Sequence, residues 1–138
     1  GFIRSFYEIN DVEVTTMINT KHNIVSAHTS FTLQRPSMQY IQAITDSELL
    51  VLTHESMEKL YRDFPKWERL GRLITERVYG YVERRVVDYL SLTPEERYRK
   101  LLEENAKLVK NVPLRYVASM LGITPETLSR IRNKVHKG

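Results

Sequence analysis

The front of the chain carries runs of β-favouring residues. Residues 2–9 and 12–18 are two such runs. Asn10 and Asp11 lie between them and are residue types that tolerate the positive φ angles of a two-residue hairpin turn. The pattern therefore predicts a β-hairpin at the start of the chain.

The next segment is less regular. Residues 20–23 are polar and predict a loop, and residues 25–33 are compatible with a short helical turn. Residues 40–45 and 48–52 are again rich in β-favouring residues, with Asp46 and Ser47 between them. They predict a second pair of strands.

From residue 53 onward, apolar positions recur at the three- and four-residue spacing of helices. A short helix is expected from a Thr53 cap to about residue 61, and a long one from Pro65 to about residue 90. Thr93 and Glu96 form a capping-box pattern, which begins a further helix that runs to about residue 109.

The apolar stripe of the long helix is too wide for a helix that covers a single surface. One side could cover the sheet, while the other meets a partner helix of a second copy. The residues of that second side are Leu70, Ile74, Val78 and Tyr81. The alternative is a helix buried within one domain.

Two short helices follow, at residues 114–121 and 125–135. Gly122 comes after the last apolar residue of the first, where a left-handed residue ends many helices. Thr124 is a candidate N-cap for the second. This spacing is typical of a DNA-binding helix-turn-helix, whose second helix reads the major groove.

A stretch of this motif resembles a known family. Gly122-Ile123-Thr124 followed by Glu126-Thr127-Leu128-Ser129-Arg130 is similar to the reading helix of the CRP-FNR transcription regulators, and the E-x-x-S-R pattern is closest to the FNR branch. Residues 41–49 also resemble the closing strands of that family's cyclic-nucleotide-binding β-roll.

The resemblance implies an α+β fold in three parts: a partial β-roll at 1–62, a long dimerisation helix and hinge at 63–91, and a winged helix-turn-helix at 92–138. It implies a cytoplasmic, bacterial-type homodimer that binds double-stranded DNA and RNA polymerase. The chain begins Gly1-Phe2-Ile3, directly in a strand-like run. Because the family has more β-roll before this point, a truncated chain is expected.

The charge is unevenly distributed. Residues 1–60 hold 4 basic and 7 acidic residues, whereas residues 107–138 hold 7 basic and 1 acidic residue. A basic C-terminal end favours an anionic partner. Lysine and arginine on a protein surface often contribute only to solubility, so charge alone does not identify the partner. The helix-turn-helix pattern is what indicates that the anionic partner is DNA.

Three residues of the last helix are candidates for base reading: Glu126, Ser129 and Arg130. The Arg130 fork matches the O6 and N7 acceptors of guanine, and Glu126 can accept from a cytosine amino group or hold that fork in place. The alternative is an ordinary surface pair between these two side chains. Pro125 departs from the family pattern, because proline offers no polar side chain for a base contact at the outer part of the half-site.

Other polar residues lie at helix starts or along the flank of the motif, where phosphate contacts position a protein on DNA. The candidates for these contacts are Arg115, Thr124, Thr127, Arg132 and Lys134.

The effector site is poorly supported. The family binds cyclic nucleotides through a Gly-Glu pair and an Arg-Ser pair. Here residues 23–37 contain neither Gly nor Glu, and Pro36 separates Arg35 from Ser37. In a phosphate-binding loop, glycine lets backbone N–H groups approach the phosphate closely. Because these residues contain no glycine, cyclic AMP is not expected as a ligand. Arg35 and Ser37 remain the candidates for an effector pocket.

The chain lacks the residue patterns that cofactor-binding, metal-binding and catalytic sites require. The chain has no cysteine, which excludes an iron-sulfur cluster held by these residues. His22, His28, His54 and His136 form no metal-binding pattern, and no catalytic motif or membrane-spanning run is present. We therefore expect no cofactor, no metal and no enzymatic activity. The alternative to a DNA-binding regulator is a ligand-sensing or protein-interaction module whose helix-turn-helix docks a protein.

Overall fold

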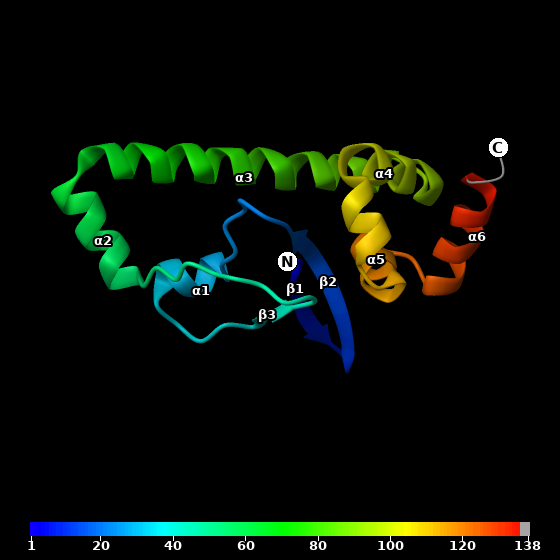
Figure 1. Cartoon of the computed structure of the whole chain (residues 1–138), viewed down its shortest axis with the longest axis horizontal. Coiled ribbons are helices and arrows are strands. Elements are labelled where there is room, and N and C mark those ends of the chain that lie inside the picture. Colours follow the sequence, from blue (N-terminus) through cyan, green and yellow to red (C-terminus); the bar gives the residue numbers. More distant parts are fainter. Residues whose placement is uncertain (136–138) are drawn as a thin grey trace. The chain divides into compact units, whose positions relative to one another are not determined.

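The computed structural model describes residues 1–135, and within this range the chain is an α+β protein with a three-stranded antiparallel sheet and six helices (Figure 1). It forms two compact units. One contains Gly1–Glu48 and the chain from Thr93 onward, and the other is Leu49–Leu92. The sheet therefore shares a unit with the C-terminal helices.

The sheet confirms the predicted hairpin. Strands β1 (Ile3–Ile9) and β2 (Val12–Asn19) pair antiparallel, and Asn10 and Asp11 both adopt positive φ angles, 51° and 61°. These are the angles of a two-residue turn that matches the twist of its strands. The third strand, β3 (Gln39–Ala43), lies on the other side of β1, so that β2 and β3 are the two edges.

The predicted pairing of residues 40–45 with residues 48–52 is wrong. The strand β3 pairs with β1 instead, and residues 48–52 form no strand. Leu50 and Val51 are almost completely exposed there. Strand formation depends on packing against neighbouring residues as well as on composition, and residues 48–52 leave the outer edge of β3 unpaired. The segment before β3 contains the short helix α1 (His28–Leu33).

In the second unit, α2 (His54–Asp63) packs against α3 (Pro65–Ser91). Thr53 caps α2 as predicted, since its hydroxyl accepts from the Ser56 N–H at 3.1 Å. The Tyr61 hydroxyl lies where a side chain at Gly71 would begin, so glycine lets the two helices approach closely here.

The C-terminal helices are α4 (Pro94–Asn111), α5 (Leu114–Leu121) and α6 (Pro125–Val135). The predicted capping box of Thr93 and Glu96 is present. α4 is kinked at Asn105, whose φ and ψ are −152° and 64°. The Asn105 side chain accepts from the Leu108 N–H at 3.1 Å and thereby caps the second part of the helix.

The main core lies among these three helices, with one residue from β2. Its fully buried members include Tyr98 of α4, Val117 and Ala118 of α5 and Leu128 of α6, and Ile18 joins them from the sheet. Figure 1 shows β2 running beside α5. The core therefore binds the helix-turn-helix to the hairpin as one packed body.

Candidate nucleic-acid interface

The turn between α5 and α6 has the backbone geometry that the motif predicts. Gly122 ends α5 in the left-handed region with φ 69°, and the following N–H of Ile123 donates to the Ala118 carbonyl at 3.1 Å. Thr124 then caps α6, since its hydroxyl accepts from the Thr127 N–H at 3.2 Å. Hydrogen bonds thus satisfy backbone groups at the C-terminal end of α5 and at the N-terminal end of α6, only a few residues apart. The angle between the two helices is therefore well defined.

The burial pattern of α6 separates an inner from an outer face. Leu128 is 1 % exposed and packs against α5, where the small Ala118 permits close approach. Glu126, Ser129 and Arg130 are all exposed. Because they occupy positions i, i+3 and i+4, they share the outer face. The structure thus brings together the three candidate base-reading residues.

Hydrogen bonds order part of this face. One terminal nitrogen of Arg130 donates to the Thr127 hydroxyl at 3.2 Å. Hydrogen bonding from its own backbone N–H and from the Thr124 hydroxyl lowers the pKa of Glu126, with a smaller attraction from Arg130. Glu126 therefore stays ionised near neutral pH and acts only as an acceptor, which is the role that pairing with a cytosine amino group requires.

The candidate phosphate contacts are dispersed around this face. Thr124 and Thr127 belong to the cap of α6, where backbone N–H groups and the helix dipole favour an anion. Arg115 is exposed on the first turn of α5, and Arg132 is half-buried on α6.

Lys134 is engaged in the unbound protein. Its ammonium lies 2.6 Å from Oε2 of Glu95, and the other carboxylate oxygen, Oε1, accepts from Arg99 at 2.9 Å. The pair joins the first turn of α4 to the last turn of α6. A phosphate contact by Lys134 requires this pair to open, so its role in DNA binding stays a prediction.

This ion pair makes stability depend on pH. Hydrogen bonds from Lys134 and then Arg99 lower the pKa of Glu95. Because the pKa of Glu95 is lower in the folded state than in the unfolded state, its ionised form stabilises the fold at pH values above the ordinary glutamate pKa. This stabilisation is lost as the pH falls from roughly 4.5 downward. We expect Glu95→Gln to lower the melting temperature at pH 7 and to have a smaller effect at pH 3. Circular dichroism melts at the two pH values measure this.

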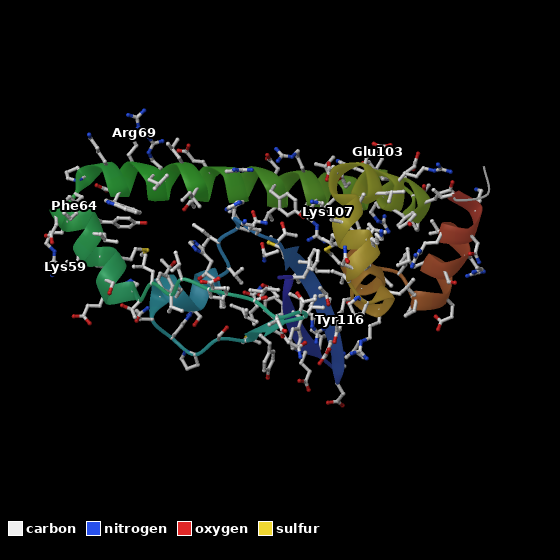
Figure 2. The ribbon with its side chains drawn as sticks, in the orientation of Figure 1. Lys59, Phe64, Arg69, Glu103, Lys107 and Tyr116 are labelled. Atoms are coloured by element: carbon white, nitrogen blue, oxygen red, sulfur yellow. The ribbon has the colours of Figure 1, made fainter. Side chains whose placement is uncertain are left out.

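The matched control for that variant is Glu103→Gln, an exposed glutamate of the same helix, labelled in Figure 2. It should leave the melting temperature nearly unchanged at both pH values. An equal loss from Glu95→Gln at pH 7 and pH 3 would show that the charge of Glu95 is not what stabilises the contact.

The two candidate effector residues lie in an exposed turn. The Ser37 hydroxyl donates to the Gln39 carbonyl at 2.9 Å and accepts from the Gln39 N–H at 3.0 Å. Arg35 is exposed beside it. The serine is thus engaged in a local turn, and the two side chains project from a surface loop between α1 and β3.

The candidate dimer residues lie on α3, the long helix of the second unit. None of the α3 residues, all of which the structure describes, is buried. Leu70, Val78 and Tyr81 are exposed, and Ile74 is half-buried. An apolar helix face that remains open to water is the kind of surface that marks a protein contact.

Arg4 is a residue that the sequence pattern did not single out. It is 1 % exposed and lies between β1 and α5, with its guanidinium over the rings of Phe6 and Tyr116. A fully buried arginine is rare unless it is paired. The sequence does show an arginine within an otherwise β-favouring run, which is a signal of an unusual position. Its aromatic partner Tyr116 on α5, however, lies more than a hundred positions further along the chain.

Metal sites and membrane spans concern residues 1–135 as a whole. In this part of the chain, no three or more histidine, aspartate or glutamate side chains come together as metal ligands. His136 lies outside the described residues. Over the same range, no helix combines the length and apolar character needed to cross a bilayer.

A scan against protein-family models found no model that matches the chain, and a search of curated proteins found no matching sequence.

Proposed function

We propose that this chain is a sequence-specific, double-stranded DNA-binding transcription regulator that acts as a homodimer on a pseudo-palindromic site. The observation that supports it most is the pair α5 and α6. Their turn is closed by Gly122 and Thr124, and α6 presents Glu126, Ser129 and Arg130 together on one exposed face. This arrangement suits a helix that enters the major groove.

The finer assignments rest on the resemblance of the sequence to the CRP-FNR family. In this proposal the sheet is part of a cyclic-nucleotide-binding-like β-roll that does not bind cyclic AMP, and the C-terminal helices belong to a winged helix-turn-helix. RNA polymerase is the further partner, and the cytoplasm is the compartment. The exposed apolar face of α3 supports a helix-mediated dimer.

Dimerisation accounts for how a short reading helix achieves specificity. One helix contacts only a few base pairs, whereas two helices related by a twofold axis read two half-sites about 34 Å apart on one side of the duplex. Such a site is a pseudo-palindrome, because the symmetry of the protein is repeated in the DNA.

The salt dependence of binding to random duplex DNA tests the proposal against protein docking. DNA binding through several Lys and Arg contacts to phosphates makes log K fall steeply with log salt. A helix-turn-helix that docks a protein would show weak binding to duplex DNA with a flat salt dependence. Fluorescence anisotropy with a labelled duplex between roughly 50 and 200 mM salt measures the slope.

Arg132→Ala provides a residue-level form of this test. We expect it to weaken binding to all duplex sequences alike and to reduce the magnitude of the salt slope by about 1, because one phosphate contact is lost. Lys59→Ala, at an exposed lysine on α2, removes the same charge away from α6 and is the control (Figure 2). Equal slopes for the two variants would remove Arg132 from the interface.

A further inference from the structure

A row of aromatic rings and guanidinium groups crosses from the sheet to α5. The rings of Tyr40 on β3 and Phe6 on β1 stack with centroids 5.1 Å apart. The Arg4 guanidinium lies 4.0 Å from the Phe6 centroid and 3.9 Å from that of Tyr116. Arg115 follows, 4.7 Å from the same Tyr116 ring. Figure 2 places Tyr116 where α5 meets the hairpin.

Arg4 is held firmly in the middle of this row. Its Nε donates to Gln42 Oε1 at 2.7 Å and a terminal nitrogen donates to Glu13 Oε2 at 2.6 Å. The other terminal nitrogen lies 3.5 Å from the Thr15 hydroxyl. A buried guanidinium that is ion-paired, hydrogen-bonded and close to two aromatic rings has little freedom to move. The ring of Tyr116 is therefore packed against a fixed surface.

A second contact attaches the same side of α5 to the edge of the sheet. The Thr15 N–H donates to the Ser119 hydroxyl at 2.8 Å, and that hydroxyl donates to the Glu13 carbonyl at 3.3 Å. Ser119 thus satisfies two backbone groups of the edge strand β2. Because it lies three residues after Tyr116, the two contacts hold one face of α5.

Arg115 forms the α5 end of the row. It is exposed on the first turn of α5, and one terminal nitrogen donates to the Tyr116 hydroxyl at 2.8 Å. An unrestrained arginine side chain loses conformational entropy when it is fixed on a ligand. The contact with Tyr116 orders this side chain before any ligand arrives.

We propose that Tyr116, packed against Arg4 of the sheet, is a positioning residue that orders Arg115 for contact with a DNA phosphate. The sheet is then part of the DNA-binding apparatus through Arg4, although it does not touch the duplex at this point. This inference rests on the proposed DNA-binding function, and it adds two residues that neither contact bases nor belong to α6.

A double-mutant cycle on duplex binding tests it. Tyr116→Phe keeps the ring that packs on Arg4 and removes only the hydroxyl that accepts from Arg115. We expect this change to weaken binding about two- to tenfold, the range of one hydrogen bond. In the Arg115→Ala background, the same change should have almost no effect, because the side chain that it positions is gone.

A purely structural role for Tyr116 gives a different result. The losses from Tyr116→Phe and Arg115→Ala would then add, and the melting temperature of Tyr116→Phe would fall in parallel. Additive losses overturn the inference, and so does unchanged binding by Arg115→Ala. Arg4→Lys, which keeps the charge but loses the planar stack, is a second variant, and its effect on binding should likewise depend on the presence of Arg115.

Failure of the proposed function is distinguishable from failure of this inference. If the unaltered chain shows no salt-dependent binding to duplex DNA, both are overturned. If it binds with a steep salt slope and the cycle is additive, the DNA-binding proposal stands and only the role of Tyr116 is removed.

Discussion

Replacing Arg130 with alanine is expected to weaken binding to the preferred duplex by about 1–3 kcal/mol, or roughly 5- to 150-fold. It should also relax the preference at one G·C pair in each half-site. The side chain is exposed on the outer face of α6, and its fork matches the two acceptors of guanine. Competition binding with duplexes that differ at single base pairs measures both effects.

Arg132→Ala is the comparison for that measurement. Both variants remove one guanidinium from α6, but Arg132 is assigned to a phosphate and should weaken all sequences equally. An Arg130→Ala protein that binds less tightly yet keeps its sequence preference would place Arg130 on the backbone of the DNA. An unchanged affinity would remove it from the interface.

Leu128→Ala is expected to lower the free energy of unfolding of the C-terminal helices by about 2–5 kcal/mol. Leu128 is 1 % exposed and joins α6 to the core around Ala118 and Val117. Alanine leaves a cavity that this close packing cannot readily fill. Chemical denaturation followed by circular dichroism measures the change.

The neighbouring Ser129→Ala is the control for stability, because the serine is exposed on the opposite face. It should change the free energy of unfolding by no more than about 0.5 kcal/mol while it affects DNA binding. If Leu128→Ala unfolds at the same denaturant concentration as the unaltered chain, then α6 does not pack on this core.

Much of the local structure could be predicted because it depends on residues that are close in sequence. The turn at Asn10 and Asp11, the capping box of Thr93 and Glu96 and the left-handed Gly122 each follow from a few neighbouring residues. The base-reading candidates share a face for the same reason, since helical spacing alone determines it.

The features that could not be predicted depend on distant partners. Residues 48–52 have a strand-like composition, but they form no strand and do not pair with the open edge of β3. The row from Tyr40 to Arg115 joins two strands to a helix near the other end of the chain. A single sequence shows that the neighbours of Arg4 favour a strand. It does not show which aromatic ring will cover the buried guanidinium of Arg4.

The division into compact units also depends on such contacts. The sequence pattern groups the short helix α2 with the sheet, whereas the structure groups it with α3. The sheet instead shares a core with α4, α5 and α6 through Ile18 and the contacts of Arg4 and Ser119.

The measurement that tests the central claim most directly is the selection of bound sequences from a random duplex pool. It is run in parallel with the unaltered chain and with Arg130→Ala. We expect the unaltered chain to enrich an inverted repeat whose half-sites lie about one helical turn apart, and Arg130→Ala to lose the preference at one G·C pair in each half. A pool that remains random after selection with the unaltered chain would contradict sequence-specific DNA binding and would favour the protein-docking alternative.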